Sequence, residues 1–423
     1  MTTTAELYYD PWDSACREDL FGTYSRLLAE APVYLGPNGI WAVSSYDGVQ
    51  FIMGHPELFS NRPNQDETIG FPPKLDLEAP GAAELLGRLM DVATQLPLDF
   101  DELLTARVIV GADAPIHTRQ RKIVNRGFTP RRVAGLQTRI DEIVAECLTG
   151  IENRTEFDLL HELAIPVPVG VIGDLLSVER SRHADVRRWT EVLATLPTSE
   201  NRSDPESVFA LLAMLQEFSE YFVPIVESRK TNPQDDLISD LVRAVEDDWM
   251  TVTETVLFLL VMMSAGNETT TNLVCSTVIQ LLSNPDQLDL LLATPDLLPQ
   301  AIEEAVRHQS PFQFLFRETV TDVEVCGTLI PKDAVIAILV GAANRDPAHF
   351  PDPDAFDITR TTPHLGFGKG VHFCLGAPLA RLEARRTLGA LLPHLKRFRL
   401  AEPPEVSDSL LIHGYRDVRL IAD

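Results

Sequence analysis

Cys374 lies in a glycine-rich loop directly before a helical stretch. The loop reads HLGFGKGVHFCLGAPLARLEAR, in which Gly366, Gly368, Gly370 and Gly376 flank the cysteine. Glycine permits left-handed turns, so backbone N–H groups can point at the sulfur, and the N-terminus of the following helix favours negative charge there. We expect a cysteine that ionises and serves as a metal ligand or a nucleophile. The alternatives are an incidental buried cysteine in a turn and a catalytic-cysteine hydrolase, which would need a His base and an orienting Asn or Asp.

An acid and an alcohol interrupt an apolar helix farther upstream. Thr251 and Glu254 form a capping box that predicts a helix to about Leu282, which at about 1.5 Å per residue spans roughly 45 Å. Inside it stands the run AGNETT at residues 265–270. Glycine within a helix costs about 1 kcal/mol, and threonine can turn its hydroxyl to the carbonyl one turn back, so we expect a loosened backbone ladder. Glu268 and Thr269 could pass protons at this point.

Glu304 and Arg307 stand three residues apart in the helix predicted at residues 299–309, which Pro311 closes. Most pairs of this kind are solvated surface pairs worth a few tenths of a kcal/mol. They lie upstream of the cysteine loop, and this position favours a role other than that of a surface pair.

These three features together resemble the cytochrome P-450 family. Its cysteine-ligand signature, F-G-x-G-x-H-x-C-x-G, matches at Phe367, Gly368, Gly370, His372, Cys374 and Gly376, its A-G-x-[DE]-T groove matches at residues 265–269, and its E-x-x-R matches at Glu304 and Arg307. The resemblance implies that Cys374 is the axial ligand of haem b (heme b, iron protoporphyrin IX), that Phe367 shields the sulfur, and that His372 and the backbone from Gly368 to Gly376 lie on the proximal side.

The same resemblance gives roles to the other motifs. Ala265 and Gly266 would form the oxygen-binding groove, and Glu268 and Thr269 the acid and the alcohol of a proton relay to dioxygen. Glu268 replaces the Asp that many members carry. Arg360 would complete a buried, structural Glu-Arg-Arg network with Glu304 and Arg307.

The haem propionates should meet cations or histidines. His117 and Arg121 lie one turn apart in a helix that we expect Asp113 to cap, with Pro115 near its first turn. Arg317 follows the E-x-x-R helix and His364 opens the cysteine loop. Each alone reads as a surface residue, but all four resemble the family's propionate contacts.

The resemblance also implies a distal pocket. We expect its walls at Met262, Ala265, Gly266, Gln313, Phe314, Leu315, Leu411 and Ile412, with contributions from residues 85–110 and 193–199. Most of these side chains are apolar, which predicts a small apolar substrate such as a terpenoid, a steroid or a fatty compound.

The composition restricts partners and location. A net charge of −26 repels nucleic acid and anionic membranes, and the longest apolar run, Val256 to Met263, is far shorter than the roughly 20 residues of a membrane span. The five cysteines are scattered and no secretory signal is visible, so we expect a cytoplasmic protein without disulfides and, in our reading, a monomer.

Electrons should come from outside the chain, because it has no dinucleotide-binding turn and no iron–sulfur cysteine spacing. A ferredoxin with its reductase is the expected donor. It could dock on basic residues of the expected proximal side, which are otherwise ordinary solvated helix faces: Arg119, Lys122, Arg126, Arg131, Arg132, Lys369, Arg381, Arg385 and Arg386.

Helical periodicity marks residues 133–151, 208–226, 254–282, 299–309 and 377–392. Short β-like runs occur at residues 33–35, 40–43, 323–326, 335–339, 410–412 and 418–421. No repeat or linker divides the chain, so we expect one domain, residues 1–423, that is mainly α with a small β-rich lobe, in the cytochrome P-450 fold. The expected activity is a haem-thiolate monooxygenase using O₂; an H₂O₂-driven peroxygenase and a non-catalytic haem sensor stay open as alternatives.

Overall fold

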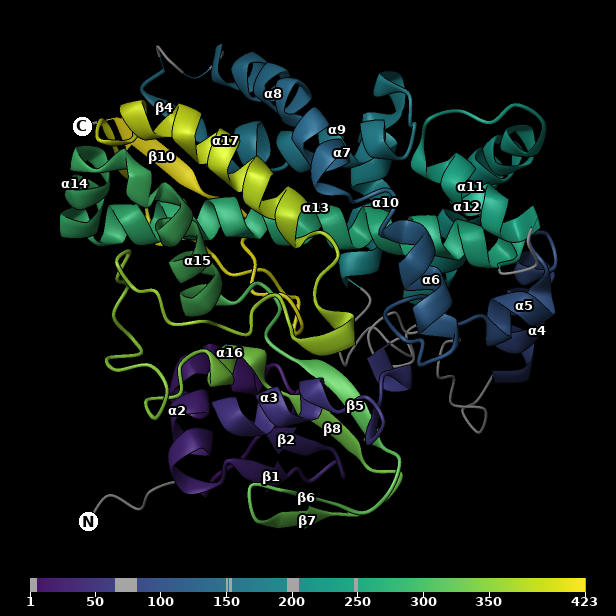
Figure 1. The fold of residues 1–423 in the computed structure, drawn as a ribbon, viewed down its shortest axis with the longest axis horizontal. Helices are drawn as coiled ribbons and strands as arrows, with labels where there is room; N and C mark the ends of the chain where they lie inside the picture. Colours follow the sequence, from purple (N-terminus) through teal and green to yellow (C-terminus); the bar gives the residue numbers. More distant parts are fainter. Residues whose placement is uncertain are drawn as a thin grey trace.

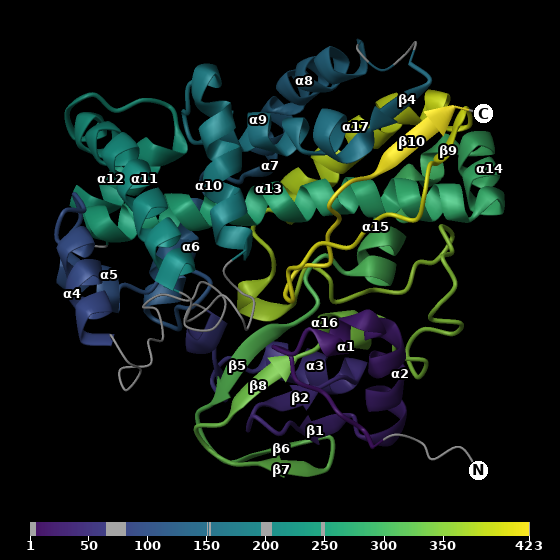
Figure 2. The same ribbon diagram turned by 180° about the vertical axis from the view of Figure 1, so that it is seen from behind.

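A computed structural model of the chain describes residues 6–64, 82–149, 151, 154–195, 205–246 and 250–422. Helices form most of it, and a smaller β-rich lobe lies at one side (Figure 1). The view from behind shows the same two parts, with irregular segments between them (Figure 2). This agrees with the predicted fold class.

The β-rich lobe is built from both ends of the sequence. Its main sheet has the order β1-β2-β8-β5-β3, with β2 parallel to β8 and the other pairs antiparallel. Because β2 pairs with β8, the N-terminal segment lies beside residues that follow the E-x-x-R helix. The lobe comprises α1 (Ala15–Glu18), α2 (Leu20–Glu30), β1 (Val33–Leu35), β2 (Trp41–Val43), α3 (Tyr46–Gly54), β3 (Phe59–Ser60), β5 (Leu315–Thr319), the hairpin of β6 (Val323–Val325) and β7 (Thr328–Ile330), β8 (Val335–Ile338) and α16 (Val340–Ala343).

The helical part surrounds one long helix, α13 (Val252–Ser283), whose 32 residues span about 48 Å. Thr251 and Glu254 form the predicted capping box at its start. Around it lie α4 (Ala82–Ala93), α5 (Phe100–Thr105), α6 (Ile116–Val124), α7 (Pro130–Gly135), α8 (Gln137–Thr149), η2 (Leu160–Ala164), α9 (Pro166–Leu175), η3 (Arg180–Arg182), α10 (His183–Thr195), α11 (Pro205–Thr231), α12 (Leu237–Glu246), α14 (Pro285–Ala293), η4 (Pro295–Leu297), α15 (Leu298–Gln309), η5 (Gly370–His372) and α17 (Ala377–Leu395).

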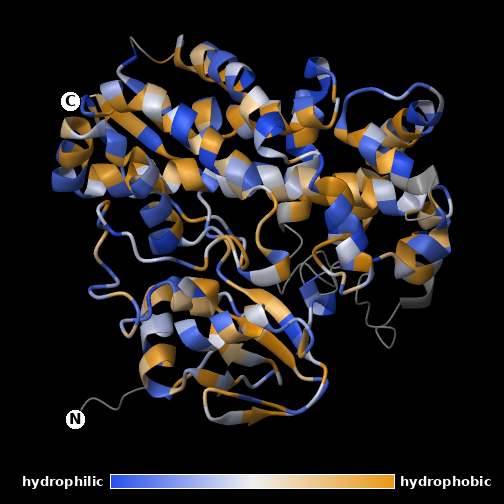
Figure 3. Cartoon of the chain, viewed as in Figure 1, coloured by the Kyte–Doolittle hydropathy of each residue, from blue (hydrophilic) through white to orange (hydrophobic). Residues whose placement is uncertain are grey.

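A second sheet closes the far end of the helical part. It has the order β4-β10-β9 and joins β4 (Glu156–Asp158) to β9 (Phe398–Leu400) and β10 (Arg419–Ala422). In Figure 3 the surface helices alternate between hydrophilic and hydrophobic residues, as expected where one face is buried. The apolar faces of the helices meet in one large core, which positions α13 and α17.

Most predicted elements are confirmed to within a few residues, and three expectations are wrong. Residues 133–151 divide into α7 and α8, with Leu136 between them. Residues 410–412 form no strand; only Ile412 makes an isolated bridge, to Phe312. The backbone of α13 stays helical through residues 265–270, although the Thr269 hydroxyl does donate to the Ala265 carbonyl at 2.8 Å.

One described helix, within α11, is long and apolar enough by length and composition to cross a membrane. It runs from Glu206 to Thr231, and 44% of its most apolar window is buried inside the protein. A core helix passes the same test, so this is weak evidence for a span.

Candidate functional site

The cysteine loop connects the β-rich lobe to α17. It runs from His364 to Gly376, and η5 occupies its middle. The Cys374 N–H donates to the Phe367 carbonyl at 2.8 Å, and Arg121 on α6 donates to the Phe373 carbonyl at 2.7 Å. These bonds fix the cysteine within its loop and hold the loop against α6.

Two glycines of this loop are required by its backbone. Gly368 and Gly370 both have φ +71, a region that side chains rarely adopt. A Cβ at Gly370 would also stand 2.8 Å from the Met53 carbonyl oxygen. Gly366 and Gly376 do not have positive φ; Gly366 is needed because a Cβ would collide with Val306.

The Cys374 sulfur receives the expected N–H groups, but they do not decide its ionisation. Burial raises the pKa of this thiol, while the backbone N–H groups of Gly376 and Ala377 and the charges of Arg121 and Arg381 lower it by less. The loop alone therefore leaves the thiol protonated, contrary to our expectation of an ionised cysteine. A bound metal would supply the missing stabilisation, since a coordinating thiol is deprotonated outright.

A cavity of about 1500 Å³ lies between α13 and the cysteine loop. Cys374, Gly376 and Phe367 line one side of it, and Ala265, Gly266 and Thr269 line the other. The cysteine and the AGNETT run, 105 residues apart at Thr269 and Cys374, thus face the same space. Among the described residues, no group of three or more His, Cys, Asp or Glu side chains could hold a metal by itself.

Arginine and histidine side chains gather at one edge of this cavity: His117, Arg121 and His372 line it, and Arg317 lines the space next to it. The rings of His117 and His372 lie 3.9 Å apart, and the His117 Nε2 is buried without a hydrogen-bond partner among the described residues. Burial lowers the pKa of Arg317 to about 10, and burial with the charges of His117, Arg317 and Arg121 lowers that of His372 to about 2. Such a cluster fits an anionic group with several oxygens. The two propionates of haem have that chemistry, so the residues present fit this cofactor.

His364 does not belong to this edge. Its Nε2 lies 3.1 Å from Glu303 Oε2 and its Nδ1 accepts from the Gly366 N–H, and neither cavity wall includes it. His372, which we expected on the proximal side of haem, lines the cavity.

The helix that carries His117 and Arg121 begins differently from our expectation. Pro115 precedes α6 directly and no side chain caps this helix. The Asp113 carboxylate instead accepts hydrogen bonds from the Ser60 hydroxyl and the Asn61 N–H. Asp113 therefore ties α6 to the β-rich lobe.

Glu268 and Thr269 point into a second cavity that is continuous with the first. Glu268, Thr269, Ala265, Leu315, Leu411 and Ile412 line this space of about 1160 Å³, together with Phe312 and Val110. Burial raises the pKa of Glu268 to about 7. The carboxyl group can therefore both hold and release a proton near neutral pH.

Glu268 also lines a third, polar cavity on the other side of α13. Thr190, Glu191, Asn267 and Ser407 stand in its wall. The Asn267 Oδ1 and the Ser407 Oγ are buried without a partner among the described residues, which is the usual setting of an ordered water. Glu268 thus connects a polar space with the apolar one.

Two predicted pocket residues lie elsewhere. Gln313 is buried and its amide donates to the Gln309 and Ser310 carbonyls. Phe314 packs against Trp12, with ring centroids 5.9 Å apart. The Gln313 N–H and C=O bond to Leu411 and Gly341, and this fixes the segment with both side chains away from the cavity.

The other pocket expectations have mixed outcomes. Met262 lines the cavity beside Cys374 rather than the one beside Glu268. Val110 and Leu193 come from the two stretches expected to contribute, although residues 196–199 lie outside the described residues. The wall residues that we did not predict include Leu260, Val261, Ser264, Phe312 and Ser409.

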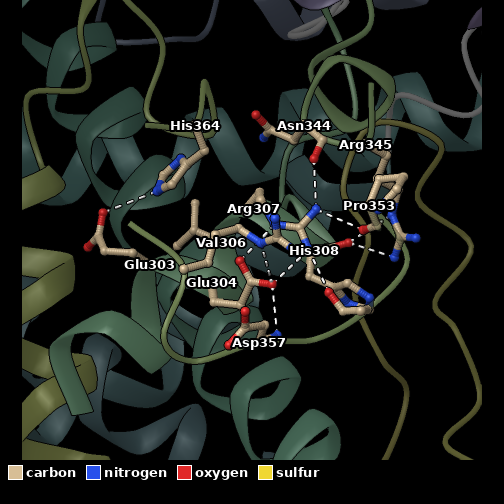
Figure 4. Close-up of polar contacts among 12 residues, drawn as sticks. Glu303, Glu304, Val306, Arg307, His308, Asn344, Arg345, Pro353, Asp357 and His364 are labelled. Atoms are coloured by element: carbon tan, nitrogen blue, oxygen red, sulfur yellow. Dashed lines mark hydrogen bonds and ion pairs between the residues drawn. The ribbon is translucent and has the colours of Figure 1, made fainter. Parts of the chain in front are cut away.

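A buried network of ion pairs and hydrogen bonds is centred on Glu304 and Arg307 of α15 (Figure 4). Arg307 donates to both Glu304 oxygens at 2.7 Å, and Arg360 Nε lies 3.4 Å from Glu304. Arg307 also bonds three carbonyls of the proline-rich connection, those of Asn344, Pro353 and Ala355. The network holds that connection in place before the cysteine loop.

Of the nine basic residues proposed for docking, Arg132, Arg381 and Arg386 are only partly exposed and form ion pairs with acidic neighbours. Arg132 pairs with Asp235 and Asp240, Arg381 with Glu303, and Arg386 with Asp141. The other six are exposed: Arg119, Lys122, Arg126, Arg131, Lys369 and Arg385.

Comparisons with known proteins agree with this geometry. The model of the family described as "Cytochrome P450" matches residues 292–414. The chain is 37% identical to "Cytochrome P450 107B1" of Saccharopolyspora erythraea over 401 residues, covering 93% of this chain and 92% of the relative. It is 34% identical to "6-deoxyerythronolide B hydroxylase" of the same organism over 398 residues, covering 92% and 91%.

A solved structure has the same fold. The structure of "P450BioI in complex with hexadec-9Z-enoic acid ligated Acyl Carrier Protein" matches with a TM-score of 0.82 at 28% identity, covering 97% of this chain and 99% of that one.

Proposed function

Because the chain belongs to the cytochrome P450 family, whose members are haem-binding oxidoreductases, we propose that it inserts one atom of O₂ into a small apolar substrate, by hydroxylation or epoxidation. The observation that carries this proposal is the shared cavity, with Cys374 on one wall and Glu268 and Thr269 opposite. Against a hydrolase, the groups that lower the pKa of the Cys374 thiol are the backbone N–H groups of Gly376 and Ala377 and the charges of Arg121 and Arg381, and none of them is a His base.

Bound haem would supply the redox chemistry that cleaves O₂. Cys374 would hold its iron, and His117, Arg121, Arg317 and His372 would surround its propionates. Phe367 would cover the sulfur, with the Arg381 guanidinium 4.2 Å from its ring centre. Gly266 and Gly368 leave room along the cavity walls.

Glu268 and Thr269 would move the protons that the reaction consumes. With a pKa of about 7, Glu268 can take a proton from the polar cavity and pass it toward the apolar one. The Thr269 hydroxyl donates to Ala265, so its oxygen can still accept a hydrogen bond from a proton donor. The two residues therefore act in sequence.

The walls of the distal space select an apolar substrate. Leu260, Val261, Phe312, Leu315 and Leu411 dominate them. The names of the relatives point the same way: one is a hydroxylase of 6-deoxyerythronolide B, and the solved structure is a complex with an acyl carrier protein ligated to hexadec-9Z-enoic acid. A terpenoid, a steroid or a fatty compound fits this space.

Bacterial relatives take electrons from redox partners, and a ferredoxin with its reductase is our proposed donor. The six exposed basic residues of the predicted docking surface support it, since an acidic ferredoxin could approach them. We propose a cytoplasmic monomer without a membrane span as the working form.

The experiment is turnover with isotopically labelled O₂. The haem-loaded protein is screened with apolar compounds for a change of the ferric spin state, and each binder is incubated with NADPH, a ferredoxin and its reductase. One labelled oxygen atom in the product supports the proposal. Binding without product under any donor indicates a haem sensor, and full turnover with H₂O₂ alone, unchanged in Glu268→Gln, indicates a peroxygenase.

A further inference from the structure

Glu383 is a buried acid that none of the roles above uses. It lies on α17, its side chain is 3% exposed, and its Oε2 has no hydrogen-bond partner among the described residues. Thr387, one turn later, is also buried with an unpartnered hydroxyl. A buried carboxyl that lacks a partner is costly, and packing alone would be served better by an apolar side chain.

The side chain lies in the wall of the cavity that contains Cys374. Leu379 and Ala380 accompany it from α17, Thr270 and Leu273 from α13. Glu383 therefore lies near the proposed haem, nine residues after the cysteine.

Several charged groups on the elements packed against α17 form ion pairs, while Glu268 of α13 faces the neighbouring cavities. Cys374, His117, Arg121 and His372 share the cavity, and the neighbouring pairs are Asp141 of α8 with Arg386, Asp174 of α9 with Arg139, Arg132 of α7 with Asp240, and Glu303 of α15 with Arg381. Burial is the sole cause that raises the pKa of Glu383, to about 8. No neighbouring charge shifts it.

We propose that in alkaline solution, where the ferric protein holds Glu383 as a carboxylate, Glu383 takes up one proton from water for each electron that the haem accepts, so that the net charge of this buried region stays constant. The redox partner supplies the electron, and the proton forms an O–H bond on the Glu383 carboxylate. The added electron makes the site more negative, and a nearby negative charge in a medium of low dielectric constant favours the neutral acid. Glu383 thereby compensates the charge of the added electron and does not touch the substrate.

The expected signature is a reduction potential that depends on pH. Above the pKa of about 8, reduction and proton uptake are linked. Each tenfold fall in proton concentration then lowers the potential by about 59 mV for one electron. Below that pKa the acid is already protonated in the ferric state, and its contribution to the slope vanishes.

The experiment is a spectroelectrochemical titration of the haem-loaded protein from about pH 6 to about pH 10, a range that brackets the pKa of the acid. The wild type should show the alkaline slope, and Glu383→Gln should lose it. The variant should fold, because it removes an acid whose raised pKa costs stability at neutral pH. Glu268→Gln is the matched control: it removes another carboxyl whose pKa is raised by burial and should keep the alkaline slope.

A second measurement detects the proton on the carboxyl group directly. Infrared difference spectra of the reduced minus the oxidised wild type, recorded above pH 8, should contain the C=O band of a newly protonated carboxylic acid. That band should be absent in Glu383→Gln. An alkaline slope that persists in Glu383→Gln, or a wild type with neither slope nor band, overturns the proposal.

This inference depends on haem binding and not on the substrate. If no compound is oxygenated but the slope and the band are present, the proposed function fails while the role of Glu383 stands.

Discussion

Replacing Arg307 with methionine should be among the most destabilising single changes in this protein. The side chain is 1% exposed and makes five hydrogen bonds, two of them to the Glu304 carboxylate. Without it, Glu304 stays buried with Arg360 as its remaining cation, at 3.4 Å. Breaking a buried pair from one side costs about 3–5 kcal/mol. Domains are stable by about 5–15 kcal/mol, so this is a large part of the total.

The assay is guanidinium chloride unfolding of the purified haem-loaded protein, followed by tryptophan fluorescence. The midpoint concentration should fall while the slope of the transition stays the same. Arg26→Met is the control, because Arg26 pairs with Glu30 on the surface and such pairs contribute at most about 1 kcal/mol. Glu304→Leu combined with Arg307→Met should cost less than Arg307→Met alone. A loss below about 1 kcal/mol in Arg307→Met would refute the reasoning.

Three further changes test other parts of the site. Glu268→Gln should reduce product formation by about 10²–10⁴-fold, measured as substrate-dependent turnover, with substrate binding spectra unchanged; unchanged turnover would exclude the relay. Gly370→Ala should lower haem content and thermal stability, because its φ of +71 and the Met53 carbonyl at 2.8 Å leave no room for a Cβ, whereas Gly135→Ala on α7, where an added Cβ has no neighbour within 4 Å, should behave as the wild type; equal haem content in both variants would contradict this. Burial alone would raise the pKa of Glu303, but hydrogen bonds from Arg381 and His364 lower it to about 2. A lowered folded-state pKa contributes stability that is present above the unfolded value of about 4.3 and is lost as the pH falls toward 2, so Glu303→Gln should flatten the acid limb of unfolding curves; an identical acid limb in both proteins would argue against it.

The sequence predicted those parts of the molecule that local rules determine. The capping box at Thr251 and Glu254 marks the start of α13, because both partners lie within one helical turn. The glycines of the cysteine loop follow a local rule too, because a left-handed backbone turn favours glycine. Of the four glycines in this loop, Gly368 and Gly370 have positive φ.

Contacts between distant segments were beyond such rules. Asp113 looked like a helix cap, but Ser60 and Asn61 from the β-rich lobe engage its carboxylate. His364 looked like a propionate contact, but Glu303 on α15 holds its ring. Gln313 and Phe314 turn away from the pocket because Leu411, almost a hundred residues later, binds the backbone there. Each error came from a partner that sequence spacing does not reveal.

Every proposal above depends on a bond between the Cys374 sulfur and haem iron. The direct measurement is the absorption spectrum of the haem-loaded protein, reduced under carbon monoxide, for the wild type and Cys374→Ser. The wild type should show the long-wavelength maximum for which the family is named, and the serine variant should lack it. A wild type without that maximum, or a serine variant that retains it, would contradict the assignment.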